Sequence, residues 1–194
     1  MLYAQHDFAE STDEEIILLY KSGDQEAFKI LINRYASPLY NFTARLTNRN
    51  DASDIVQEIF IKVWKNIKHF NPAKASFKTW IFTIARNATT DFLRKKKSLL
   101  FSDIGGNDDE NMDSFSENIP DKDLLPDAAL QKLQDSRLLD EILQKLPSNY
   151  REVLLLHYQE EMTFDEVGKI LDKPLNTVKS QHRRAIMKLR KMLN

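Results

Sequence analysis

The stretch KASFKTWIFTIARNATTDFLRKKK, residues 74–97, combines four large aromatic residues with a strongly basic end. At about 100° per residue its apolar positions fall on one face of a helix, with a second apolar strip beside that face. We therefore predict a helix with one buried side and a second side buried along part of its length. The main face holds Phe77, Ile81, Ile84, Ala88 and Phe92, and the second strip holds Phe82 and Leu93, bridged by Ala85.

Trp80 lies at the margin of the main apolar face. Its neighbours on the helix surface are Thr83, Asn87 and Arg94, a polar row that leads to the basic end. Stacking of an unpaired base on an aromatic ring contributes roughly 1–3 kcal/mol, and nearby cations can hold the phosphate backbone. The position fits a half-buried core residue and a base-stacking platform equally well, so both interpretations stay open at this point.

The preceding segment, DASDIVQEIFIKVWKNI (residues 51–67), also has a helical period. Opposite its apolar face lies an isolated Ile61 among charged residues. Single surface apolar residues are common, although one ringed by polar groups can anchor a protein partner. The pattern alone favours the first interpretation. The apolar face holds Val56, Ile59, Phe60, Val63 and Ile67, and the opposite side holds Asp54, Glu58, Ile61 and Lys65, with Gln57 at the edge.

Near the carboxyl end, LPSNYREVLLLHY (residues 146–158) precedes TFDEVGKILDKPLNTVKSQHRRAIMKLRKML (residues 163–193). Thr163 and Glu166 have the spacing of a capping box. Small Gly168 falls where two helices would cross closely, and Asp172 with Pro174 breaks the helix. This spacing predicts a helix-turn-helix.

The last helix is strongly basic. From residue 173 onward there are seven Lys or Arg and no acidic residue, which favours DNA binding over an ordinary solvated face. His182 falls on the apolar face and is predicted to belong to the core or its edge. The other predicted core positions are Val178, Ala185, Ile186 and Leu189, and the predicted exposed positions are Lys179, Ser180, Arg183 and Arg184.

Apart from one acidic stretch, the chain has a helical period with no alternating pattern typical of strands. Residues 98–127 contain nine acidic residues and one Lys, and we expect a flexible acidic linker there. The predicted fold is all-α, with two helical domains at residues 1–97 and 128–194, the second a helix-turn-helix. The predicted helix caps are Thr12 with Glu15, then Asp24, Asp51 and Ser76.

Several functional classes find no support in the sequence. There is no Cys, and the four His do not cluster at a ligand spacing. No nucleophile–base pair or Gly-rich phosphate loop is present, so we expect no enzyme, no metal and no cofactor. The first fifteen residues do not have the pattern of a secretion signal, and no apolar run approaches the ~18 residues of a membrane span. We expect a soluble, cytoplasmic protein without membrane insertion.

Three segments, residues 51–67, 77–97 and 146–190, occur in an order that resembles a bacterial RNA polymerase sigma factor of the sigma-70 family, extracytoplasmic-function (ECF) group. The resemblance implies a dissociable, non-catalytic subunit that directs promoter recognition and melting. It implies binding to the clamp coiled coil of the largest polymerase subunit, to the flap of the second largest, and to promoter DNA. The resemblance also implies that an anti-sigma factor binds and controls the protein.

The resemblance also implies roles for individual residues. Core polymerase would be bound by Asp54, Gln57, Glu58 and Ile61. The melted "−10" element would be bound by His69, Asn71, Lys74, Lys78, Trp80, Asn87 and Arg94, with the loop at residues 69–76 capturing a flipped base. The "−35" element would be bound by His157, Thr177, Lys179, Ser180, Arg183 and Arg184.

Two other functions account for only part of the sequence. A stand-alone helix-turn-helix regulator accounts for residues 128–194 but leaves the first domain without a role. A metal-dependent nuclease using the carboxylates between Asp103 and Asp113 lacks a general base.

Overall fold

A computed structural model describes residues 11–47, 49–101 and 137–193 of the 194-residue chain. Every regular element within these ranges is helical, as predicted, and none of the helices is long and apolar enough to cross a membrane. The N-terminal bundle consists of α1 (Asp13–Lys21), α2 (Gln25–Leu46), α3 (Arg49–Asn66), a 3₁₀ turn η1 (Ile67–His69) and α4 (Phe77–Phe101). The C-terminal bundle consists of α6 (Arg137–Gln144), α7 (Ser148–Leu154), a π-helical turn η3 (Leu155–Gln159), α8 (Phe164–Leu171) and α9 (Leu175–Leu193).

Side-chain caps begin helices α1, α2 and α4 of the N-terminal bundle. Thr12 and Glu15 form the predicted capping box, with Thr12 N donating to Glu15 Oε2 over 2.8 Å. Asp24 Oδ1 accepts from Glu26 N (3.0 Å) and Ser76 Oγ from Thr79 N (3.2 Å). The prediction that Asp51 caps α3 was wrong, because the helix begins at Arg49. Asp51 lies in the first turn instead and pairs with Lys96 of α4 over 2.7 Å.

Helix α4 is buried on two sides, as its two apolar strips predicted. Phe77 packs edge-on against Tyr35, and Phe82 packs edge-on against Phe42, both with partners on α2. The second strip ends before Leu93, which is 36% exposed. The side chains of α4 that are at most 1% exposed are Phe77, Ile81, Phe82, Ala85, Ala88 and Thr89.

Helices α8 and α9 form the predicted helix-turn-helix. Thr163 and Glu166 close a capping box, and Asp172 ends α8 with a left-handed φ of 53°. The turn after α8 brings the backbone close to Gly168. A Cβ built at Gly168 would lie only 2.9 Å from Lys173 O. The four predicted core positions of α9 are at most 1% exposed: Val178, Ala185, Ile186 and Leu189.

Gly168→Ala is expected to destabilise the C-terminal bundle by about 1–2 kcal/mol. The new methyl group would press on a backbone carbonyl, and such overpacking costs ~1–3 kcal/mol, partly offset by the better helix propensity of Ala. Thermal unfolding followed by circular dichroism measures the change. Lys169→Ala, an exposed change on the same helix, is the control, and an equal melting temperature for the two variants would contradict the close approach.

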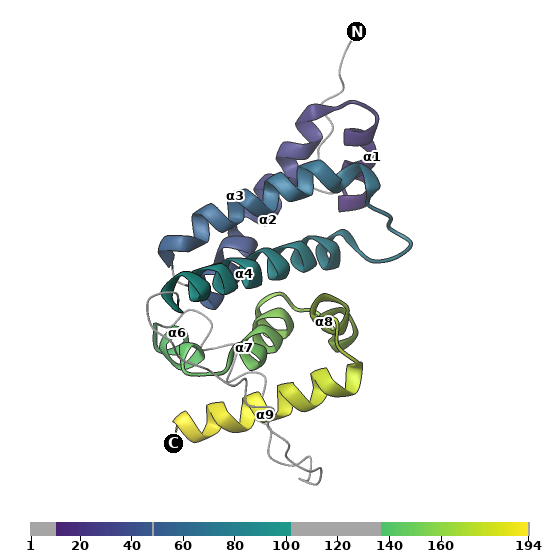
Figure 1. Ribbon diagram of the computed structural model, residues 1–194. Helices are drawn as coiled ribbons and strands as arrows, with labels where there is room; N and C mark the ends of the chain where they lie inside the picture. Colours follow the sequence, from purple (N-terminus) through teal and green to yellow (C-terminus); the bar gives the residue numbers. More distant parts are fainter. Residues whose placement is uncertain (1–10, 48, 102–136, 194) are drawn as a thin grey trace.

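The two bundles lie against each other, with α4 on α8 and α2 on α6 and α7 (Figure 1). Arg151 joins them by donating to backbone carbonyls at two helix ends. Its NH1 contacts the O atoms of Arg45 (3.2 Å) and Leu46 (3.5 Å) at the end of α2, and its NH2 contacts those of Gln144 and Leu146, both at 3.0 Å. Carbonyls at a helix end lack partners within the helix, so a single buried guanidinium satisfies groups from both bundles.

The predicted linker lies largely outside the described residues. Helix α4 takes in residues 98–101, the first four of that stretch. The remainder, including the carboxylates between Asp103 and Asp113, is not among the residues that the structure describes.

Candidate functional site

The outer face of α3 is a continuous exposed stripe. The four residues expected to bind core polymerase all lie on it with exposed side chains: Asp54, Gln57, Glu58 and Ile61. Ile61 is 52% exposed, and Trp64, one turn further on, is 54% exposed. Two large apolar side chains one turn apart and beside carboxylates form a typical anchor for a protein partner. Trp64 was not predicted, although its three-residue spacing from Ile61 is a signal in the sequence.

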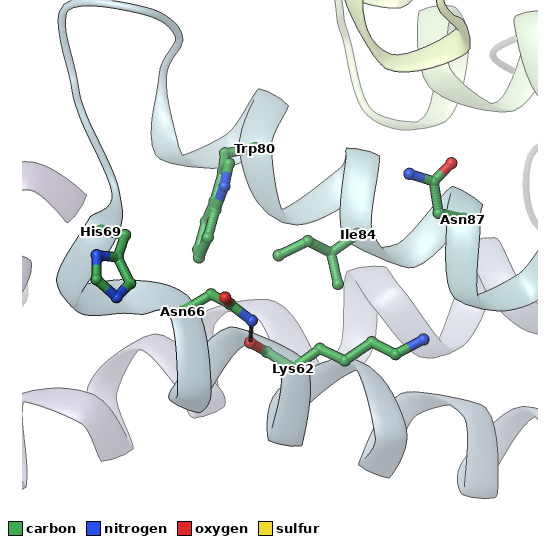
Figure 2. A pocket seen from close by; sticks show the side chains of 6 residues that line it. All are labelled: Lys62, Asn66, His69, Trp80, Ile84 and Asn87. Carbon is green, nitrogen blue, oxygen red and sulfur yellow. Dashed lines mark hydrogen bonds between the residues drawn. The ribbon is translucent and has the colours of Figure 1, made fainter.

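A pocket of about 490 Å³ opens between the end of α3 and the first half of α4 (Figure 2). Half-buried Trp80 forms one wall, and its ring packs against those of Phe70 (5.4 Å between centroids) and Phe77 (5.6 Å). This places Trp80 both in the packing of the core and at an open surface, so the two interpretations of its position are compatible. The pocket is lined by Lys62, Asn66, His69, Trp80, Ile84 and Asn87.

The pocket brings together three of the residues predicted for the "−10" element and three that were not. His69, Trp80 and Asn87 were predicted, whereas Lys62, Asn66 and Ile84 were not. Asn66 Nδ2 donates to Lys62 O over 2.8 Å, which fixes the orientation of this amide (Figure 2). The lining thus combines an aromatic face, two amides and a cation.

The loop at residues 71–76 carries two more of the predicted residues. Asn71 and Lys74 have exposed side chains, and the loop is folded on itself. Asn71 Oδ1 accepts from Ala73 N (3.0 Å), and Asn71 O accepts from Lys74 N (3.1 Å). The cationic Lys74 is therefore presented from a small turn next to the pocket.

Two other predicted residues of α4 lie away from the pocket. Arg94 is exposed and pairs with Asp91 over 2.9 Å. Lys78 lies between the bundles, where its Nζ donates to Glu160 O. Burial raises the pKa of the Glu160 carboxyl, and Lys78 partly opposes that rise. In this arrangement of the bundles Lys78 is committed to an internal contact.

The predicted "−35" residues of α9 form one side of the helix. Lys179 and Ser180 are exposed, whereas Arg183 and Arg184 are half-buried. Ser180 Oγ donates to the carbonyl of half-buried Thr177 over 2.9 Å. A terminal nitrogen of Arg183 is buried without a hydrogen-bond acceptor among the described residues. The exposed part of this surface therefore begins in the first turns of α9.

His157 and His182 belong to an aromatic cluster inside the C-terminal bundle. The half-buried His157 ring stacks on Phe164 with centroids 4.3 Å apart, and its Nδ1 lies 2.7 Å from Met162 O. His182 is 8% exposed and shares a 2.8 Å hydrogen bond with the Tyr158 hydroxyl, which confirms its predicted core position. Within the described ranges no group of three His, Cys, Asp or Glu is placed to hold a metal ion.

An ion pair between the bundles adds to the contacts of Arg151. Arg86 Nε on α4 lies 3.6 Å from Glu152 Oε2 on α7, and the carboxylate side chain is only 11% exposed. Burial raises the pKa of Glu152, while Arg86, Lys173 and Arg151 lower it. Glu152 is therefore a buried carboxylate among cations from both bundles.

Family models match both bundles. Sigma-70 region 2 matches residues 31–99, and Sigma-70 region 4 matches residues 136–189. The chain is 37% identical over 174 residues to the ECF RNA polymerase sigma factor SigW of Bacillus subtilis, covering 89% of this chain and 92% of that protein. It is 29% identical over 175 residues to the ECF RNA polymerase sigma-E factor of Haemophilus influenzae, covering 90% and 91% of the two chains.

Solved structures share the fold. CnrH, in complex with the cytosolic domain of CnrY, aligns with a TM-score of 0.66 at 24% identity, covering 94% of this chain and 97% of CnrH. The sigma factor RpoE of Bartonella quintana, in complex with the anti-sigma factor NepR, aligns with a TM-score of 0.66 at 23% identity, covering 86% and 96%.

The matches span both bundles, so the alternative of a stand-alone helix-turn-helix regulator is not supported. The order of the segments, the all-helical fold and the identity to SigW agree. The chain belongs to the ECF group of the sigma-70 family, whose members are the sigma factors that direct RNA polymerase to promoters.

Proposed function

We propose that this sigma factor works through three surfaces with separate tasks. Residues 1–97 bind core polymerase and the melted "−10" strand, and residues 128–194 bind the "−35" duplex. The protein acts by binding in the cytoplasm and contributes no catalytic group, since RNA synthesis belongs to the polymerase. The observation that carries the proposal is the pocket beside Trp80, which joins an aromatic wall to amides and a cation.

The pocket is proposed to hold one unstacked base of the non-template strand. Trp80 supplies a stacking face, the amides of Asn66 and Asn87 supply donors and acceptors for base edges, and Lys62 supplies a positive charge for a phosphate. Reading a base in this way requires its removal from the stack, which costs least in a strand that is already melting. Asn71 and Lys74 on the adjacent loop would contact the same strand, with Arg94 further along α4. Lys78 would join them once the bundles separate and release it from Glu160 O.

The stripe on α3 is proposed to dock on the clamp coiled coil of the largest polymerase subunit. Ile61 and Trp64 would be buried at the centre of the contact, ringed by Asp54, Gln57 and Glu58. Apolar anchors inside a polar ring are the usual source of most of the binding energy at such interfaces. The C-terminal bundle would contact the flap of the second largest subunit.

The first turns of α9 are proposed to enter the major groove of the "−35" element. Lys179 and Ser180 would face the duplex first, with Thr177, Arg183 and Arg184 beside them and His157 near the backbone. Basic side chains without acidic neighbours suit this task because phosphate contacts provide most of the affinity.

An anti-sigma factor is proposed as the regulator of this protein. Two proteins of the same fold were solved with a bound partner: CnrH with the cytosolic domain of CnrY, and the sigma factor RpoE with the anti-sigma factor NepR. The exposed stripe on α3 offers such a partner the same apolar anchors that the polymerase would use.

Reconstituted transcription tests the function as a whole. Purified protein is combined with sigma-free bacterial core polymerase and a library of fragments from its own genome. Transcripts that start downstream of a shared two-element sequence are expected, and they identify both elements. If the protein forms no complex with core polymerase, the proposed function is wrong.

Trp80→Leu is expected to weaken binding of the "−10" single strand about tenfold. Leu keeps apolar bulk against Phe70 and Phe77 but removes the stacking face, which contributes roughly 1–3 kcal/mol per base. Fluorescence anisotropy with a labelled single strand from the identified promoter measures the affinity. Trp64→Leu, on the α3 stripe, is the matched control and should bind the strand normally. If the two variants bind the single strand with equal affinity, Trp80 does not stack on a base of that strand.

A further inference from the structure

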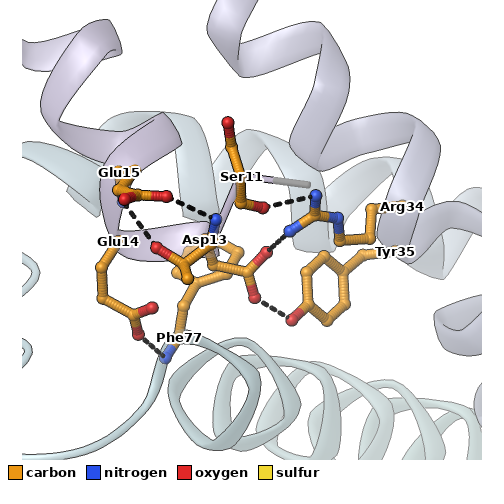
Figure 3. Close-up of polar contacts among 8 residues, drawn as sticks. Ser11, Asp13, Glu14, Glu15, Arg34, Tyr35 and Phe77 are labelled. Atoms are coloured by element: carbon orange, nitrogen blue, oxygen red, sulfur yellow. Dashed lines mark hydrogen bonds and ion pairs between the residues drawn. The ribbon is translucent and has the colours of Figure 1, made fainter. Parts of the chain in front are cut away.

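Helix α1 contacts both ends of the loop at residues 71–76. At the start of the loop, Lys21 Nζ donates a hydrogen bond to Phe70 O over 3.0 Å. At its end, Glu14 Oε1 accepts from the Phe77 backbone N–H over 3.3 Å (Figure 3). We propose that Glu14 and Lys21 are positioning residues that fix the span of this loop and thereby the base selectivity of the pocket. This inference rests on the proposed role of the pocket.

The spacing of the two residues suits this task. Seven residues are about two helical turns, so Glu14 and Lys21 lie on the same side of α1, roughly 10 Å apart along its axis. A helix is stiff over that length. The distance between the two anchoring groups is therefore set by α1 and not by the loop itself.

Helix α1 is itself held firmly on α2. The Asp13 carboxylate accepts hydrogen bonds from Arg34 and from the Tyr35 hydroxyl, and Arg34 also donates to Ser11 O over 2.9 Å (Figure 3). Burial, together with Asp13, raises the pKa of the Tyr35 phenol, so this hydroxyl remains a donor. Ile16 and Ile17 are at most 2% exposed. These contacts hold α1 against α2, so α1 presents Glu14 and Lys21 to the two ends of the loop at a defined position.

The anchored residues Phe70 and Phe77 are the ones that hold Trp80. Their rings meet at 87° with centroids 5.6 Å apart, and both rings touch Trp80. Phe70 also follows His69 directly, so both His69 and Trp80 on the pocket wall move with the loop ends. The Glu14 carboxylate further satisfies a first-turn amide of α4 and complements its helix dipole.

The test compares full-length variants that lose an anchor with variants that keep it. Glu14→Ala with Lys21→Met removes both hydrogen bonds, whereas Glu14→Gln with Lys21→Arg retains an acceptor and a donor. Glu26→Ala with Lys29→Met is the matched control, because this exposed pair bonds only within its own helix. The probe is a random pool of single-stranded DNA decamers, enriched on wild-type protein and then varied one base at a time.

Two readouts are made on each variant. Hydrogen–deuterium exchange of residues 70–77 is expected to accelerate at least tenfold in Glu14→Ala/Lys21→Met and to stay near wild type in the other two. Base discrimination at the pocket position is expected to fall at least fivefold in the same variant, while discrimination at the other positions and the melting temperature change little.

The outcomes separate this inference from the proposed function. One outcome is that the wild type discriminates among bases and Glu14→Ala/Lys21→Met has the same hydrogen–deuterium exchange and the same base discrimination. The positioning role is then overturned, while the proposed role of the pocket in base binding is retained. Loss of base discrimination at all positions of the strand, together with a lowered melting temperature, would show a general structural role for the two residues. That outcome would also overturn the positioning role. If the wild type shows no base discrimination at all, the role of the pocket fails, and the inference fails with it.

Discussion

Glu58→Lys combined with Ile61→Glu is expected to weaken binding to core polymerase several hundred-fold. The first change reverses a charge and the second removes an apolar anchor, and together they should cost about 3–4 kcal/mol. Both side chains are exposed, so the fold should be unaffected beyond the loss of the surface Glu58–Lys62 pair, worth ~0.3–0.5 kcal/mol. Titration of labelled protein with sigma-free core polymerase measures the affinity.

The control makes the same types of change elsewhere on the N-terminal bundle. Leu18→Glu with Glu26→Lys alters an exposed apolar residue on α1 and an exposed carboxylate on α2. This variant should bind the polymerase like the wild type. If both double variants bind equally, the α3 stripe is not the docking surface.

Glu152→Met is expected to weaken the contact between the two bundles by about 3 kcal/mol. The change leaves Arg86, a mostly buried cation, without the carboxylate that lies 3.6 Å away. Replacing both partners, as in Glu152→Met with Arg86→Met, should restore part of the contact, because Arg86 is no longer left unpaired and Arg151 keeps its backbone carbonyl acceptors. Lys78 would be released from Glu160 O whenever the bundles separate.

Energy transfer between two dyes measures the separation. The chain has no Cys, so Lys29→Cys on α2 and Lys191→Cys on α9, both exposed positions, accept labels specifically. The single variant should shift the population toward low transfer, and the double variant should shift it back. Helix content by circular dichroism controls for unfolding of the C-terminal bundle. Identical transfer in all three proteins would show that the pair does not hold the bundles together.

Features set by neighbouring residues along the chain could be predicted from the sequence. The two capping boxes, the caps at Asp24 and Ser76, and the close approach at Gly168 depend on spacings of a few residues. The predicted cap at Asp51 was wrong because α3 begins earlier, at Arg49. The sequence does contain a residue of a preferred N-cap type directly before that start, Asn48, and this signal was overlooked in favour of Asp51.

Features made by two helices meeting could not be predicted. Lys62 and Asn66 join the pocket only because the end of α3 lies beside Trp80 of α4. Likewise, nothing in the local pattern of α7 indicates that Glu152 and Arg151 are buried, since charged residues are normally exposed unless a partner from elsewhere meets them. The periodicity of α4 predicted its buried strips but not that Lys78 would face the C-terminal bundle.

The chain contains two tryptophans, and each lies on a different working surface. Trp64 projects into water from the α3 stripe, while Trp80 forms the wall of the pocket. Indole emission shifts to shorter wavelength when the ring is desolvated and is quenched when a nucleobase stacks on it. Polymerase binding should therefore shift the emission of Trp64, and single-strand binding should quench Trp80. Trp64→Phe leaves Trp80 as the reporter of strand binding, and Trp80→Phe leaves Trp64 as the reporter of polymerase binding, so the two events can be followed separately on two variants.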